Sequence, residues 1–251
     1  MKKVALFVLL GTVFNISLSA IEYEARSEFI YCNLNEGMTV SDAAEQAKAY
    51  GKFSKEQGTQ YMQHIIVPIH AGDTDYDYML MGSWPDGKSM YEEWGSYLND
   101  YGDGSSDVSM PAGECGARVA AFNTGVVHNR IDMQDWDKRR PVQFSGCKLK
   151  DGASMSDVHN VMKEDSRLLS ENGFSGYGRN TLTTYLGFKA DYPYDFVDMF
   201  HWDSFERRGH MAQNYGKFAD KYPDVETSYS DITECAPSRS FYIELLFNNV
   251  N

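Results

Sequence analysis

After its first fourteen residues the sequence has no long apolar run, so it predicts no transmembrane segment in the mature chain. It is also poor in basic residues, with 23 Lys and Arg against 36 Asp and Glu, and a formal net charge of −13. An acidic surface repels phosphate backbones, which argues against nucleic acid as a partner. No C-x-x-C, phosphate-binding loop, G-x-S-x-G or H-E-x-x-H pattern occurs, so the sequence predicts no redox, nucleotide, hydrolase or metal site of these kinds.

The start of the chain has the pattern of a secretory signal peptide. Two lysines precede an apolar run from Val4 to Phe14, and small residues follow up to Ala20. We predict a signal peptide over residues 1–20 and export of the mature protein, to the periplasm or the medium. Cleavage removes Lys2 and Lys3, which brings the net charge to about −15.

One pattern occurs twice in the chain. YCNLNEGMTVSD at residues 31–42 aligns with GCKLKDGASMSD at residues 146–157. Each copy ends in a capping-box pattern, which predicts a strand, a glycine turn and a capped helix. The pattern continues downstream, where YDY at 76–78 aligns with YDF at 194–196 and two later helical stripes also correspond. Each half therefore reads as β-α-β-β-α-β, a ferredoxin-like unit.

These repeats predict the organisation of the chain as an α+β protein. We expect a first ferredoxin-like repeat at residues 21–128, a linker at 129–141 and a second repeat at 142–251. Helices cover only one face of such a unit, yet its strands are apolar on both faces. The two βαββαβ units are therefore expected to pack sheet to sheet.

The four cysteines of the chain suit an exported protein with disulfides. In a ferredoxin-like unit the first strand lies between the third and the fourth and runs antiparallel to both. Cys32 and Cys147 sit late in a first strand, and Cys115 and Cys235 sit just before a fourth strand. Of the three pairings, only Cys32–Cys115 with Cys147–Cys235 joins adjacent strand ends within each half.

A family resemblance adds to this prediction. Residues 202–211, WDSFERRGHM, are similar to a tryptophan-then-histidine stretch in antibiotic-biosynthesis monooxygenase-like and haem-degrading members of the dimeric α+β barrel superfamily. The resemblance implies a pseudo-dimeric barrel within one chain, which would be complete as a monomer. It also implies Trp202 and His210 as catalytic residues and haem as a cofactor to consider. The equivalent first-half stretch, WPDGKSMYEEW at 84–94, has no histidine.

Aromatic and histidine side chains on the predicted strands are the candidate ligand contacts. Aromatic residues make up 14% of the chain, and such side chains line many small-molecule pockets. Trp84 and Trp202 occupy equivalent places, and alternation along a strand puts Ser83 and His201 on the opposite face. The sequence leaves open which face lines a cavity. The predicted ligand-binding residues are Trp84, Trp202, His64, His70, Tyr78 and Tyr185.

Three functions follow as hypotheses. The first is an exported envelope protein that binds a small, partly apolar ligand between its two halves. The second is an enzyme, either a cofactor-light monooxygenase or a haem-handling protein, that uses Trp202 and His210. The third is a structural interaction module, which the absence of any cavity would favour.

Overall fold

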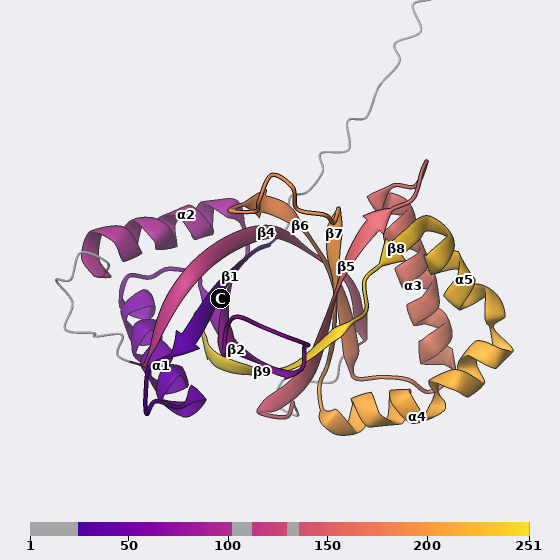
Figure 1. Cartoon of the computed structure of the whole chain (residues 1–251), viewed down its shortest axis with the longest axis horizontal. Helices are drawn as coiled ribbons and strands as arrows, with labels where there is room; N and C mark the ends of the chain where they lie inside the picture. The colour runs from indigo at the N-terminus through magenta and orange to yellow at the C-terminus, as the bar shows by residue number, and fades with distance from the viewer. Residues whose placement is uncertain (1–24, 102–111, 130–135, 251) are drawn as a thin grey trace, which may run out of the picture.

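The computed structural model describes residues 25–101, 112–129 and 136–250 (Figure 1). The predicted signal peptide and the centre of the predicted linker lie outside these residues. The strands are β1 (Arg26–Leu34), β2 (Met62–His70), β3 (Tyr78–Trp84), β4 (Gly113–Asn129), β5 (Arg139–Leu149), β6 (Tyr177–Leu186), β7 (Phe196–Trp202), β8 (Thr233–Cys235) and β9 (Arg239–Asn248). The helices are α1 (Val40–Glu56), α2 (Gly87–Ser96), the π-helix η1 (Tyr97–Tyr101), α3 (Met155–Glu171), α4 (Phe205–Lys221) and α5 (Pro223–Ile232). Among the described helices, none is long and apolar enough to cross a bilayer.

All nine described strands belong to one antiparallel sheet in the order β7-β6-β4-β1-β3-β2-β9-β5-β8. In the N-terminal segment (residues 25–129), β1 lies between β3 and β4. In the C-terminal segment (residues 136–250), β5 lies between β7 and β9. The first strand of each segment is therefore central, as the sequence predicted.

Two edges join the segments. Strand β4 pairs with β6, and β2 pairs with β9. Strand β5 also pairs with β7, so each of the eight longer strands is hydrogen-bonded on both sides. We expected two sheets facing each other, whereas the structure shows one continuous sheet. The physical reason is that the edge strands satisfy their free N–H and C=O groups by pairing with the other segment.

The two predicted helix starts are confirmed. Thr39 accepts a hydrogen bond from the backbone N–H of Asp42, and the Asp42 carboxylate accepts one from the backbone of Thr39. Ser154 and Asp157 make the same reciprocal pair at the start of α3. These bonds satisfy N–H groups that the first helical turn otherwise leaves without partners.

The helices pack on the outer face of the sheet. In Figure 1, α1 and α2 lie beside the N-terminal segment, and α3, α4 and α5 lie beside the C-terminal segment. Side chains of α1 pack with β1, β2 and β3 in one buried cluster, and those of α3, α4 and α5 pack with β4–β7 in another. Helix α5 was not predicted; it begins at Pro223, a residue suited to the first helical turn.

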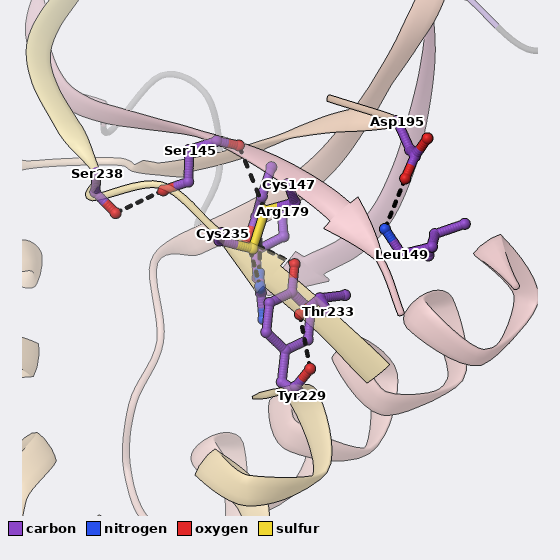
Figure 2. Close-up of a disulfide and its surroundings, with 10 residues drawn as sticks. Ser145, Cys147, Leu149, Arg179, Asp195, Tyr229, Thr233, Cys235 and Ser238 are labelled. Carbon is purple, nitrogen blue, oxygen red and sulfur yellow. Dashed lines mark hydrogen bonds and ion pairs between the residues drawn. A yellow bond between two sulfur atoms is a disulfide. The ribbon is translucent and has the colours of Figure 1, made fainter. Parts of the chain in front are cut away.

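The structure contains the disulfides Cys32–Cys115 and Cys147–Cys235. Each joins residues directly opposite each other in the strand register. Figure 2 shows the second disulfide, with Ser145 and Ser238 in contact nearby. The hydroxyl oxygens of these two residues lie 2.7 Å apart. The disulfide therefore joins β5 to β8 just before the chain enters β9.

Candidate ligand sites on the inner face of the sheet

The inner face of the sheet lines two cavities. One has a volume of about 600 Å³ and the other about 590 Å³. They lie toward opposite ends of the same strands, since β9 gives Ile243 and Leu245 to the first and Arg239 and Phe241 to the second. Between them lies a buried apolar cluster drawn almost wholly from strands of both segments. We name the two spaces the polar cavity and the aromatic cavity after their linings.

Phenylalanine side chains form the inner wall of the aromatic cavity. Phe144 of β5 meets Phe241 of β9 edge to face, with ring centroids 5.5 Å apart. Phe29 of β1 meets Phe144 at 6.0 Å, again edge to face. Strands of both segments therefore build one wall, which suits a flat apolar group.

The mouth of the aromatic cavity is formed by two hairpin turns, residues 71–77 between β2 and β3 and residues 187–195 between β6 and β7. From the first turn, Tyr76 packs against Tyr31 with ring centroids 5.0 Å apart. From the second, Tyr192 packs against Tyr194 at 5.6 Å. A side chain at Gly146 would collide with the ring of Tyr194, so only glycine leaves room for this ring.

The aromatic cavity carries positive charge and neutral hydroxyls. Arg239 lines it and acts electrostatically on both Tyr31 and Tyr76. Burial raises the pKa of Tyr31, and raises the pKa of Tyr76 and of Tyr192 to about 12. These phenols are therefore protonated at neutral pH and can donate hydrogen bonds. Among the described residues that line the cavity, none is Asp or Glu.

A chain of hydrogen bonds crosses four strand pairs beside the polar cavity. His201 Nε2 lies 3.0 Å from Asn180 Oδ1, and Asn180 Nδ2 donates to Asn123 Oδ1 at 2.7 Å. Asn123 Nδ2 donates to Ser27 Oγ at 2.8 Å, and Ser27 Oγ lies 3.0 Å from Ser83 Oγ. With each amide oriented in this way, His201 Nε2 is the donor. The chain satisfies polar groups that would otherwise be costly to bury.

Two further histidines line the polar cavity. His64 lies opposite Met81 in the β2–β3 register. The β4–β6 register shifts between Gly125 and Val127, and the bulge turns His128 toward the cavity. The imidazole of His128 folds over Gly125, where a β-carbon would collide with it. Within the described ranges, no three His, Cys, Asp or Glu side chains come together as a metal site.

Four of the predicted contacts lie next to the cavities. His64 lines the polar cavity and His70 lines the aromatic cavity. Trp84 and Trp202 border the polar cavity, but Trp84 stacks on Tyr61 at 4.9 Å and Trp202 on Phe200 at 4.2 Å. Both rings pack within outer-face clusters that include helix side chains, and both indole nitrogens are buried without a hydrogen-bond partner among the described residues. Ser83 and His201 lie on the inner face and line the polar cavity.

The other predicted contacts lie away from both cavities. Tyr78 is buried on the outer face in the cluster that contains α1. Tyr185 contacts Phe122, and its hydroxyl lies 3.0 Å from that of Tyr91. The lining residues that sequence reasoning missed include Asn123, His128, Asn180, Phe144, Tyr192, Arg239 and Phe241.

The residues of the expected haem site are not brought together. A third pocket, of about 470 Å³, lies between the sheet and α3–α5, and Trp202 lines it with Arg208. His210, the histidine that the resemblance implies, is exposed, does not line this pocket, and has its ring 5.6 Å from that of Phe174. No other described His or Cys lines the pocket either, although haem iron is most often held by one. These residues do not fit the expected group, and we derive no step through haem.

Solved structures resemble this chain to different degrees. The chain is similar to a candidate monooxygenase from Lactobacillus acidophilus, with 10% identity, a TM-score of 0.54 and coverage of 89% of this chain and 95% of that one. It also matches chlorite dismutase from Candidatus Nitrospira defluvii in complex with imidazole, with 8% identity, a TM-score of 0.46 and coverage of 88% and 92%. No protein-family model and no curated sequence matches. The first likeness shows a shared fold.

Proposed function

We propose that this protein binds a small, partly apolar molecule in the aromatic cavity. The observation that carries the proposal is the cavity itself, about 590 Å³ in volume and walled by aromatic side chains from both segments. A cavity of this size and composition is typical of small-molecule sites. Its presence also weighs against a purely structural interaction module.

We also propose that the architecture is duplicated. The two segments are two ferredoxin-like repeats, and their joined sheet is a pseudo-dimeric barrel that closes within one chain. The support is the equivalent strand order of the segments and the β4–β6 and β2–β9 pairings. A barrel of eight strands leaves an interior that can hold one small ligand. Such a chain needs no second copy to complete its site.

We also propose that the protein works outside the cytoplasm. The two disulfides suit an oxidising compartment, and the amino-terminal pattern suits export. The ligand would then be a molecule of the envelope or the medium.

Fluorescence titration with the neutral probe N-phenyl-1-naphthylamine tests the site. In a Val119→Trp variant the indole fills the aromatic cavity beside Phe29, so probe binding should be lost. In a Met62→Trp variant the indole fills the polar cavity, so binding should persist. Val197→Trp, on the opposite segment, repeats the test if Val119→Trp does not fold. Equal affinity in wild type, Val119→Trp and Val197→Trp would refute the site.

The enzyme hypothesis remains as an alternative, with the fold of the candidate monooxygenase as its support. It requires a role for His210, which the described cavities do not include. A His210→Ala variant should then lose turnover. An unchanged variant would end this alternative.

A further inference from the structure

The aromatic cavity contrasts in charge with the rest of the chain. The protein carries a formal net charge of −13, yet Arg239 and His70 are the ionisable bases of this lining and no described acid faces it. Asp75 acts on the Tyr76 phenol but does not line the cavity. An anion that is repelled over most of the surface would therefore find a favourable partner at this mouth.

The backbone that leads into Arg239 is held by the C-terminal disulfide and its neighbouring hydrogen bonds. Cys235 is tied to Cys147, and the backbone N–H of Ala236 donates to the carbonyl of Gly146 at 2.8 Å. The hydroxyl oxygens of Ser238 and Ser145 lie 2.7 Å apart. Figure 2 shows this pair beside the disulfide. Arg239 then opens β9 directly opposite Phe144 in the register. The side chain of Arg239 therefore extends from a constrained backbone next to the aromatic wall.

The neighbours of Arg239 complete a polar rim around an apolar interior. The phenols of Tyr31 and Tyr76 lie near enough for its charge to act on both, and both are donors at neutral pH. Deeper in, the wall consists of Phe29, Phe144 and Phe241. Donors at the mouth and aromatic rings behind them match a molecule with one anionic end and a flat apolar body.

We propose that the ligand of the aromatic cavity is an amphipathic monoanion, whose carboxylate or similar oxyanion binds Arg239 while its aromatic or apolar body packs on the phenylalanine wall. This inference rests on the proposed function and adds the chemical class of the ligand. Arginine suits the role because its planar fork donates two parallel hydrogen bonds to such a group.

Two probes with the same aromatic body separate the charge from the apolar contact. 8-Anilino-1-naphthalenesulfonate carries a sulfonate on the body of N-phenyl-1-naphthylamine, which is neutral. Wild type should bind the sulfonate about tenfold more tightly, as expected for one exposed charge-assisted contact. Arg239→Gln should remove this preference and leave the affinity for the neutral probe within about twofold.

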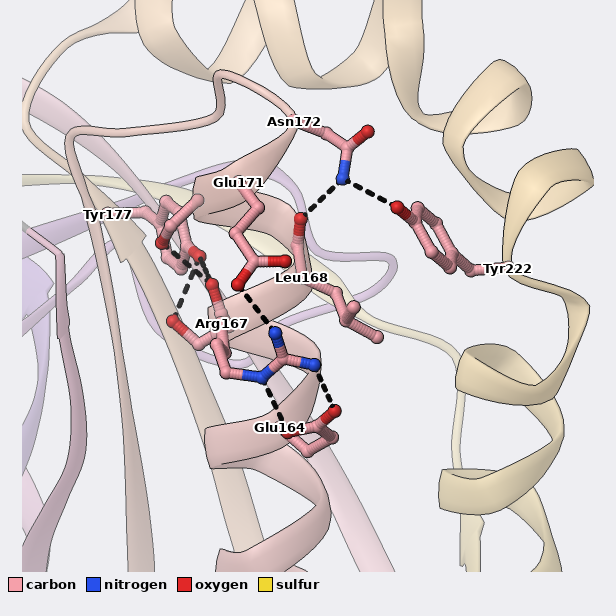
Figure 3. Close-up of polar contacts among 9 residues, drawn as sticks. Glu164, Arg167, Leu168, Glu171, Asn172, Tyr177 and Tyr222 are labelled. Atoms are coloured by element: carbon pink, nitrogen blue, oxygen red, sulfur yellow. Dashed lines mark hydrogen bonds and ion pairs between the residues drawn. The ribbon is translucent and has the colours of Figure 1, made fainter.

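The matched control removes a positive charge elsewhere. Arg167 lies on the exposed face of α3 between Glu164 and Glu171, as Figure 3 shows. Arg167→Gln changes the net charge as Arg239→Gln does and should leave both affinities unchanged. If the neutral probe binds and Val119→Trp blocks it, but Arg239→Gln leaves the sulfonate preference intact, the anion proposal is overturned while the cavity stands. If neither probe binds wild type, the proposed function itself fails.

Discussion

Asn180 of β6 donates a hydrogen bond of 2.7 Å to Asn123 of β4, so side chains as well as backbones join the two segments. The same amide accepts from His201 on β7, and Asn123 continues the chain to Ser27 on β1. This chain of hydrogen bonds lies at the opposite end of the strands from the aromatic cavity. The inner face therefore has a polar end that links the segments and an aromatic end that is open to a ligand.

Replacing Asn180 should weaken this junction. Asn180→Leu removes the central amide and leaves Asn123 with an unsatisfied buried oxygen, which should cost about 1–3 kcal/mol of unfolding free energy. Urea unfolding measures the loss. Asn214→Leu is the control, because Asn214 is half-buried on α4 and its side chain donates to the carbonyl of His210 in the same helix, away from the junction. Equal stability of the two variants would show that the chain of side-chain hydrogen bonds does not hold the segments together.

Asp165 should make the protein less stable as pH rises. Burial raises its pKa to about 6, although the charge of Arg179 acts in the opposite direction. The folded state thus favours the protonated acid, so its penalty is absent below the ordinary pKa of 3.8 and complete above about 6. Asp165→Asn should gain about 1–2 kcal/mol at pH 7.5 and almost nothing at pH 4, measured by denaturant unfolding.

Asp157 offers a control of opposite sign. Hydrogen bonds from the side chain and backbone of Ser154 lower the pKa of its carboxyl group. Its stabilising effect is therefore present above its ordinary pKa and lost as pH falls through the lower folded value. Asp157→Asn should lose stability at pH 7.5 and approach wild type in acid. If both substitutions shift stability in the same direction with pH, the assigned causes are wrong.

The ion pair of Arg179 and Asp198 should stabilise the fold strongly. The two groups lie 2.5 Å apart on adjacent strands, with side chains only 13% and 12% exposed. Asp198→Asn leaves a buried guanidinium without its counter-charge and should cost about 3–5 kcal/mol of unfolding free energy. Glu171→Gln breaks an exposed pair on α3, shown in Figure 3, and should cost under about 1 kcal/mol. Similar costs for the two variants would contradict this ranking.

The two disulfides should differ in their effect on the ligand. Removing either pair as a double alanine variant should lower the unfolding free energy by about 3–4 kcal/mol, because each closes a long loop. Only the Cys147→Ala/Cys235→Ala variant frees the loop before Arg239, so only this variant should also weaken binding of the sulfonate probe. The Cys32→Ala/Cys115→Ala variant is the matched control. Equal sulfonate binding by the two folded variants would contradict the link.

The sequence predicted the local elements well where a strong pattern set them. Residues 196–202 form β7, where the repeat predicted a strand, because apolar residues there are bounded by turn signals. The two capping boxes start α1 and α3 as expected. Helix α5 escaped prediction, since Pro223 directly after α4 was not recognised as the start of another helix.

The candidate site could be predicted only in part. Trp202 and His201 lie on opposite faces of β7, and apolar residues at both parities hide which face is inside. The β4 bulge that turns His128 inward has no clear sequence signal. Arg239 can be recognised as a site residue only after strand pairing has brought the two hairpin turns together at the mouth of the aromatic cavity. Such long-range placement does not follow from local patterns.

Native mass spectrometry of the full chain expressed and purified from cells tests the central claim most directly. Wild type and Met62→Trp should carry one small adduct that Val119→Trp lacks, because the indole occupies the aromatic cavity. Negative-ion analysis of the released molecule should then show an amphipathic monoanion. If wild type and Val119→Trp differ in mass only by the substitution, the aromatic cavity is not the ligand site.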